Sequence, residues 1–164
     1  MIAFLQSLFR RPEPAIFDAR AADAGALARV HANAFLHGWS ESEFERLLAE
    51  RSTVCHVARA SGGTGSICGF VISRIIEDEA EILMVAVSRS EQSRGLARRM
   101  IARHLGRLAA HGARQVFLEV DEGNAPAIRL YAGAGFEQVG ERPGYYAEAG
   151  KPPAAALIMR RSLD

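Results

Sequence analysis

Cysteine is scarce in this sequence, which holds only Cys55 and Cys68. Their spacing matches neither a zinc site nor a CxxC redox motif, and two cysteines are too few for a disulfide framework. If the glycines of residues 61–66 form a hairpin turn, the two thiols could face each other across paired strands. So few cysteines are typical of a cytoplasmic protein, in which disulfides are rare. We therefore expect a cytoplasmic protein with two reduced, buried thiols.

Long apolar runs and metal-ligand spacings are also missing. No apolar segment reaches the roughly 18 residues that span a bilayer, so we expect no membrane-spanning helix. The apolar residues 1–9 are followed, not preceded, by arginine, an order that argues against a secretory signal. The five histidines show no HExxH or HxH spacing, which predicts no metal site. The absence of a G-x-S-x-G elbow disfavours a serine hydrolase.

The charge of the chain is nearly balanced. A net charge of +1, with arginines spread from Arg10 to Arg161, lacks the basic field that attracts nucleic acid, so we expect neither nucleic-acid nor membrane binding. The composition, 49% hydrophobic and 24% charged, is that of a soluble globular protein. A length of 164 residues fits one domain, which we place at residues 15–164 behind an N-terminal extension at residues 1–14.

Apolar periodicity and turn residues predict an α/β protein with a mixed sheet flanked by helices, in the order βααβββαβαββ. Ser40 followed by Glu43 is a capping box, and Asn124 followed by Pro126 marks another helix start. β-Branched residues on both sides of the glycine-rich residues 62–65 indicate an antiparallel hairpin. The expected strands are residues 16–20, 53–58, 67–76, 81–87, 115–120, 136–140 and 155–160, and the expected helices are residues 23–35, 40–50, 94–112 and 124–133.

The most informative stretch is the loop that joins the strand ending at Val87 to the helix starting near Gly95. A helix entered in this way presents unpaired backbone N–H groups and the positive end of its dipole, which together suit a phosphate. No Gly-Lys-Ser/Thr follows, so the loop is not a P-loop, and taken alone it could be a plain strand-to-helix turn. The candidate phosphate-binding residues are Gln92, Ser93, Arg94, Gly95, Leu96 and Ala97.

The Q-x-x-G-x-A pattern of this loop, between an apolar strand and an amphipathic helix, resembles the coenzyme A loop of the GNAT acetyltransferase superfamily. The resemblance spans residues 16–161, and that superfamily shows the element order given above. It implies a GNAT fold, acetyl-CoA as co-substrate and direct transfer of the acetyl group in a ternary complex, without a metal. One departure is Ser93, where such loops usually carry arginine.

Other residues resemble the branch of this superfamily that acetylates protein N-terminal amines. The more specific matches are Trp39-Ser40, Leu118-Glu119-Val120 and Tyr145-Tyr146. They imply a protein N-terminal peptide as the acceptor, specifically the N-terminal alanine of small-subunit ribosomal protein eighteen. An enzyme of the same fold acting on a small-molecule amine or a lysine side chain is one alternative. A catalytically silent coenzyme A-binding module is another.

Glu119 is the candidate catalytic base. It lies in the apolar run Val116 to Val120, where a fully buried strand would carry no charge. The resemblance implies that its carboxylate takes a proton from the acceptor ammonium, directly or through water. A glutamate that points to solvent or pairs with an arginine is the structural alternative. Glu79 and Glu81, on the preceding strand, are a second choice of base near the acceptor.

The resemblance assigns the remaining site residues. Tyr131 would protonate the departing thiolate, although a core tyrosine would occupy the same helix position. Asn124 would cap that helix and contact the pantetheine arm. The acetyl group and this arm would lie along the backbone of Met84, Val85, Ala86 and Val87. The acceptor would be walled by Trp39, Tyr145 and Tyr146, unless these loop aromatics only fill space.

Overall fold

The computed structural model describes residues 11–35, 38–146 and 154–164, and it confirms the predicted order of strands and helices. The helices are α2 (Ala24–Ala34), α3 (Glu41–Ala49), α4 (Leu96–Ala110) and α5 (Ala125–Gly133), with short 3-10 turns at Ala21–Asp23, Ser61–Gly63 and Arg89–Glu91. The strands are β1 (Ala15–Asp18), β2 (Thr53–Arg59), β3 (Ile67–Ile76), β4 (Glu79–Val87), β5 (Gln115–Asp121), β6 (Glu137–Tyr146) and β7 (Ala154–Ser162).

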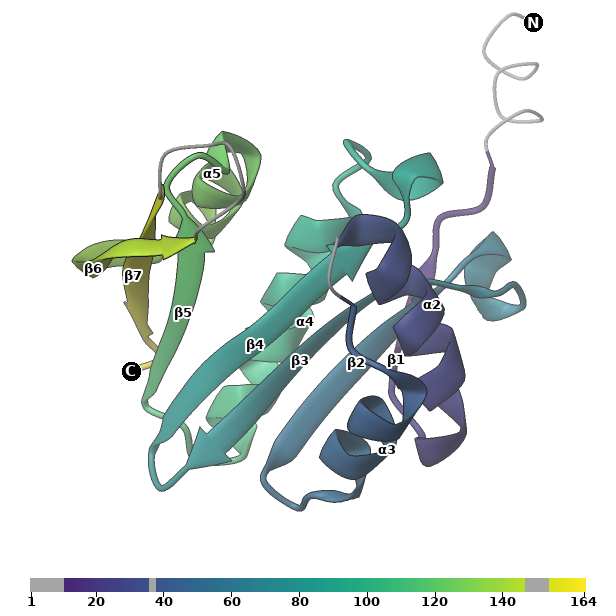
Figure 1. Ribbon diagram of the computed structural model, residues 1–164. Coiled ribbons are helices and arrows are strands. Elements are labelled where there is room, and N and C mark those ends of the chain that lie inside the picture. Colours follow the sequence, from purple (N-terminus) through teal and green to yellow (C-terminus); the bar gives the residue numbers. More distant parts are fainter. Residues whose placement is uncertain (1–10, 36–37, 147–153) are drawn as a thin grey trace, which may run out of the picture.

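The strands form one 7-stranded mixed sheet in the order β1-β2-β3-β4-β5-β7-β6. Neighbouring strands are antiparallel except β4 and β5, which run parallel. In the described chain the ladder between β4 and β5 covers only residues 79–81 and 115–117. Beyond this ladder the two strands diverge toward the ends where α4 and α5 begin (Figure 1). The sheet is therefore split at its centre.

Each face of the sheet carries its own apolar core. On one face α2 and α3 pack on β2 and β3, through residues such as Leu27, Phe44 and Phe70. On the other face α4 and α5 pack through a second cluster that includes Met100 and Leu118. Each Å² of apolar surface that these contacts remove from water contributes roughly 25 cal/mol to stability, and this burial holds the helices on the sheet. None of the helices in the described part of the chain is long and apolar enough to cross a bilayer.

A β-bulge in β4 changes which face its side chains occupy. Ile72 of β3 pairs with Met84 but Ser73 pairs with Ile82, so Leu83 has no partner in register. Ala80 and Ile82 belong to the core under α4, whereas Leu83 and Met84 both pack on the core under α2 and α3. A bulge re-aims side chains in this way because the extra residue breaks the alternation of the strand.

A chain of buried polar groups holds α4 on the sheet. Nδ1 of His56 lies 2.7 Å from Nδ1 of His104, and Nε2 of His104 lies 2.7 Å from Oγ of Ser73. Because Nε2 of His56 donates to Asp18 at 3.1 Å, its Nδ1 must accept from His104. His104 then accepts from the Ser73 hydroxyl, so both rings are neutral. Burial lowers the pKa of both histidines, that of His104 to about 3.

The predicted end of the sixth strand is wrong. The strand expected to end at Gly140 continues as β6 to Tyr146, because Pro143 and Gly144 are accommodated where the register between β6 and β7 shifts. Tyr145 and Tyr146 therefore belong to a strand, not to a loop. The expected reduced, buried thiols are confirmed, and the alternative in which they face each other is not realised. Cys55 pairs in register with Ile72, and the two thiols belong to the cores on opposite faces of the sheet. Both are free and buried, and burial raises the pKa of both.

Candidate functional site

Where β4 and β5 diverge, the facing edges of the two strands are not paired with each other. Residues 84–87 of β4 pair with β3 on one side, and residues 118–121 of β5 pair with β7 on the other. Their facing N–H and C=O groups lie beyond the β4–β5 ladder, so they are available to a bound molecule. Carboxyl ends of parallel strands are the usual position of a binding site in such sheets. The predicted backbone segment Met84, Val85, Ala86 and Val87 lies on this edge.

The N-terminus of α4 opens beside this edge. Gly95 is the residue before the helix and has a left-handed backbone, with φ 79°, which a side chain would strain. No side chain among the described residues caps this helix, so the N–H groups of its first turn, at Leu96 and Ala97, stay available to an anion. Nε2 of Gln92 donates to the carbonyl oxygen of Val87 at 3.1 Å, which ties the loop to the end of β4. Ser93 also adopts a positive φ, 58°.

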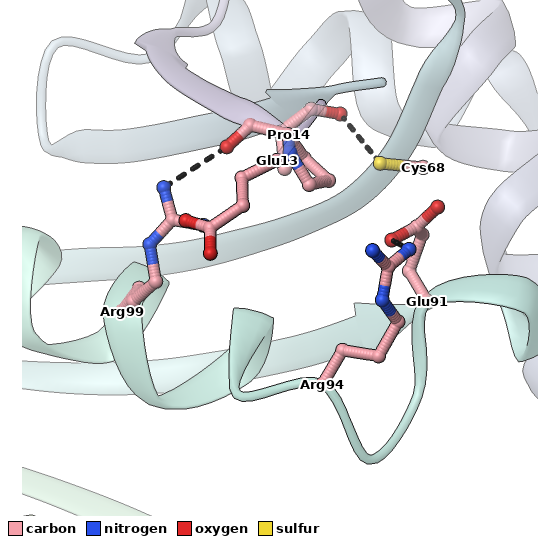
Figure 2. Close-up of polar contacts among 7 residues, drawn as sticks. Glu13, Pro14, Cys68, Glu91, Arg94 and Arg99 are labelled. Atoms are coloured by element: carbon pink, nitrogen blue, oxygen red, sulfur yellow. Dashed lines mark hydrogen bonds and ion pairs between the residues drawn. The ribbon is translucent and has the colours of Figure 1, made fainter. Parts of the chain in front are cut away.

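Arg94 is tethered within its own loop, as Figure 2 shows. Its Nη1 donates to Oε2 of Glu91 at 2.7 Å, and Glu91 is buried. One turn into α4, the Arg99 guanidinium donates to the carbonyl oxygen of Pro14 at 3.0 Å and pairs with Glu13 at 3.3 Å (Figure 2). Because both arginines are paired with glutamates, the backbone N–H groups of the first turn of α4 are the main donors available to an anion.

Asn124 and Tyr131 lie on α5, which begins just beyond β5. Asn124 is the N-cap of this helix, and its Oδ1 accepts from the N–H of Ala127 at 3.2 Å, so the predicted cap is confirmed. Tyr131 is buried in the core under α4, with its ring edge-on to Phe136 at 5.9 Å between centroids. The helix lies beside the end of β5 that has separated from β4 (Figure 1).

Glu119 lies on the open face of β5. Val116, Leu118 and Val120 point into the core, and Glu119 alternates with them, its side chain 23% exposed. β5 is buried on one face and only half-buried on the other, which explains how this apolar run carries a glutamate. Nη2 of Arg142 on β6 lies 3.1 Å from Oε1 of Glu119, so the carboxylate is paired with an arginine.

The other predicted acidic residues lie elsewhere on the split. Glu79 and Glu81 are exposed, and both sit within the β4–β5 ladder, at the closed end of the split. Glu119 lies beyond the last paired residue, Phe117, at the open end. The structure thus brings Glu119, and not Glu79 or Glu81, to the divergent edges.

The aromatic residues predicted to wall the acceptor lie in two different parts of the structure. Trp39 is half-buried and packs on the rings of His31 and Phe44 at 5.6 and 5.5 Å. Tyr145 is exposed, with the Arg142 guanidinium 5.6 Å from its ring centroid. The Tyr146 side chain lies outside the described residues, although its backbone ends β6.

The sequence analysis gave no role to Arg142, Glu91 or His31. Each acts through a contact with a residue that the sequence did single out: Glu119, Arg94 and Trp39 respectively. The Glu91–Arg94 pair could have been predicted from its spacing of three residues, because i,i+3 partners meet in a helical turn. The Arg142 contact depends on strand order and register, which no local pattern reports.

One sizeable surface cavity lies away from this site. It measures about 810 Å³ and is lined by Arg98 and Leu105 of α4, the end of α5 and the strand ends at Gln115 and Ser162. Gln115 is at the opposite end of β5 from Asp121, so this cavity does not contain the candidate base. In residues 11–35, 38–146 and 154–164, no group of three or more acidic, histidine or cysteine side chains could hold a metal ion.

Known proteins share both this sequence pattern and this fold. A model described as the acetyltransferase (GNAT) family matches residues 24–136. The N-alpha-acetyltransferase RimI of Mycobacterium tuberculosis is 36% identical over 146 residues, which cover 85% of this chain and 87% of that protein. The crystal structure of the ribosomal-protein-S18-alanine N-acetyltransferase from Escherichia coli matches with a TM-score of 0.83 at 26% identity, over 92% of this chain and 94% of that one.

The same fold has been crystallised with the expected co-substrate. Arabidopsis thaliana NAA60 in complex with acetyl-CoA matches with a TM-score of 0.80 at 21% identity, over 92% of this chain and 98% of that one. At that identity the likeness concerns the fold alone. The family match covers more than half of the chain, and it agrees with the split sheet and the uncapped α4. This chain therefore belongs to the GNAT acetyltransferase family and is an acyltransferase.

Proposed function

We propose that this enzyme transfers the acetyl group of acetyl-CoA to the N-terminal α-amine of a protein. The names of its relatives support this acceptor: one is an N-alpha-acetyltransferase and another acts on the alanine of ribosomal protein S18. The observation that carries the proposal is the position of Glu119, a carboxylate on the open face of β5 just past the point where β4 and β5 separate. The N-terminal alanine of that ribosomal protein is the specific acceptor we propose, in the cytoplasm.

The coenzyme would be held by backbone groups. The first turn of α4, at Gly95, Leu96 and Ala97, offers N–H groups and a helix dipole to the pyrophosphate, with Ser93 and Arg94 beside it. The pantetheine arm would pair with the free edge of β4 in the manner of an added strand. Asn124, at the start of α5, would meet the arm from the other side of the split.

The residues beside the split would then each carry out one step of the transfer. Glu119 removes a proton from the acceptor ammonium, and the free amine attacks the thioester carbonyl. The N–H groups near Ala86 and Val87 stabilise the negative charge that develops on the carbonyl oxygen. As the carbon–sulfur bond breaks, Tyr131 gives a proton to the departing thiolate, so that the products are an amide and a free thiol. Glu79 and Glu81 are the alternative bases.

The acceptor would lie on the face of the sheet that carries Glu119. Trp39, in the segment between α2 and α3, would wall the acceptor from one side, and Tyr145 and Tyr146, which end β6, would wall it from the other. A peptide entering between these two sides would bring its terminal amine to Glu119. Two alternatives remain in the same fold: acetylation of a small amine or lysine side chain, and coenzyme binding without catalysis.

A panel of acceptors separates these functions. The enzyme is given acetyl-CoA with peptides that begin with alanine, with N-terminally blocked peptides that contain lysine, or with small amines, and the released thiol is measured. Turnover on the alanine peptides alone is the expected result, whereas turnover only on small amines or lysine would refute the proposed acceptor. Loss of turnover in Tyr131→Phe with retained coenzyme affinity supports catalysis. A wild-type enzyme that binds the coenzyme but acetylates nothing would be a binding module.

A further inference from the structure

His31 holds Trp39 by a hydrogen bond that the proposed chemistry does not use. The imidazole lies on α2, is 1% exposed, and its Nδ1 accepts from the backbone N–H of Trp39 at 2.8 Å. Since Nδ1 accepts, the proton of the neutral ring is on Nε2. Burial lowers the pKa of His31, against a smaller opposite effect of Glu43 on α3, so the ring keeps this acceptor at neutral pH.

The same imidazole also packs on the indole. Its ring stacks on Phe35 at 4.7 Å and on Trp39 at 5.6 Å between centroids, and its edge meets Phe44 at 5.9 Å. One side chain therefore fixes both the backbone and the ring of Trp39. Gly38 also lies close to the imidazole. A Cβ added at Gly38 would lie 3.3 Å from Nδ1 of His31, so a side chain there would press on this contact.

Trp39 and Leu83 line a small cleft next to the split sheet. The cleft measures about 190 Å³, and its other lining residues are Glu43, Arg46, Leu47 and Arg74. It is smaller than the roughly 300 to 1,000 Å³ of sites for whole cofactors, so it suits a single side chain. Leu83 is the bulged residue of β4 and directly precedes the edge segment 84–87. The cleft thus adjoins the segment proposed to hold the acetyl group.

The chemistry of the cleft fits part of a peptide. Its walls are apolar at Trp39, Leu47 and Leu83. Arg74 also lines it, and the accessible end of its guanidinium pairs with Glu50 at 3.6 Å. An apolar side chain of a peptide would cover the apolar walls, and a peptide carbonyl beside it would accept from the Arg74 guanidinium.

We propose that His31 is a positioning residue for the acceptor: by fixing Trp39 it shapes the cleft that receives a side chain of the acceptor peptide. The inference rests on the proposed function, because it requires a peptide acceptor. His31 touches neither the acetyl group nor the amine. Its loss therefore weakens acceptor binding and leaves the chemical step and the coenzyme site in place.

Two substitutions separate the hydrogen bond from the ring. His31→Phe keeps an aromatic ring but removes the acceptor atom, and His31→Asn keeps an acceptor near the Nδ1 position but removes the ring. Removing one hydrogen bond of ordinary strength predicts a rise of roughly fivefold in the KM for the alanine peptide in His31→Phe. The coenzyme Kd and kcat should stay within about twofold, and His31→Asn should recover part of the loss. The exposed His111, at the end of α4, provides the control His111→Phe.

Trp39 is the only tryptophan of the sequence, so its fluorescence reports acceptor binding directly. Peptide should change the emission of the wild type at lower concentrations than in His31→Phe. A lower kcat at unchanged KM, or no change in either, would overturn the role of His31. If His31→Phe does not fold, Gly38→Ala, which presses on the same contact, takes its place under the same criteria. A wild type that never acetylates peptide would instead refute the proposed function.

Discussion

The guanidinium of Arg142 lies 3.1 Å from Oε1 of Glu119 and 5.6 Å from the ring centroid of Tyr145. The contact crosses the sheet from β6 to β5, with β7 between them. It gives the carboxylate a counter-charge and a defined direction. A half-exposed ion pair of this kind stabilises a fold by at most about 1 kcal/mol, so its role is better tested through the rate than through stability.

Glu119→Gln should abolish most turnover while the coenzyme still binds. The amide cannot take up a proton, and a general base typically contributes about 10²- to 10⁴-fold to the rate. Steady-state thiol release gives kcat, and calorimetric titration with coenzyme A gives the Kd. Glu81→Gln, at the closed end of the split, is the matched control. Should the Glu81 variant lose activity and the Glu119 variant keep it, the base has been assigned to the wrong strand.

Arg142 should act through Glu119. We expect Arg142→Gln to lower kcat/KM by several-fold, roughly what a misaligned hydrogen bond to a charged group costs. In the Glu119→Gln background the same substitution should have no further effect, because the group that it orients has gone. A double-mutant cycle on kcat/KM measures this coupling. Fully additive effects of the two substitutions would show that Arg142 works independently of Glu119.

Gly95→Pro should abolish coenzyme binding. The φ of 79° at Gly95 is incompatible with a proline ring, which fixes φ near about −65° and would redirect the first turn of α4. Ser93→Ala should barely change binding, because the backbone of the first turn is the main donor. Gly106→Ala is the control in the same helix: it has open space and should stabilise the fold by about 0.5–1 kcal/mol with unchanged coenzyme affinity. A Gly95→Pro variant that is folded and binds normally would place the phosphate elsewhere.

Stability should fall as the pH drops below about 6.5, the pKa of an unfolded histidine. His31, His56 and His104 have lowered pKa values in the folded protein, that of His104 about 3, so the unfolded chain binds more protons in the window between. The free energy of unfolding then decreases on acidification, with a limiting slope of about 1.4 kcal/mol per pH unit for His104, whose folded pKa is about 3. His31 and His56 add to the decline in the same direction.

Urea unfolding at pH 7.5 and 5.5 measures this decline. His104→Gln, which cannot take up a proton, should flatten it, and the exposed His111→Gln should leave it unchanged. A wild-type stability that is constant over this range would contradict the neutral Asp18–His56–His104–Ser73 chain.

Local rules predicted the elements well. The capping box of Ser40 and Glu43 and the cap by Asn124 are confirmed, because each depends on residues a few positions apart. The order of elements follows from the change between strand and helix periodicity, and it is confirmed in full.

Long-range pairings were beyond these rules. The His56–His104 contact joins residues 48 positions apart, and the Arg142–Glu119 pair requires the order and register of β5, β7 and β6. The half-buried face of β5 could not be predicted from an apolar run, because burial on one face or two depends on which helices cover the sheet. The extension of β6 through Pro143 depends on a register shift that a single strand does not encode.

The central claim is that acetyl-CoA lies in the split between β4 and β5, with its thioester beside Glu119. A crystal structure with acetyl-CoA tests it most directly. We predict the pyrophosphate on the N–H groups of the first turn of α4 and the acetyl carbonyl oxygen about 3 Å from a backbone N–H of residues 85–87, on the free edge of β4. A coenzyme bound instead with its thioester in the cavity lined by Arg98 and Gln115, away from Glu119, would contradict the account.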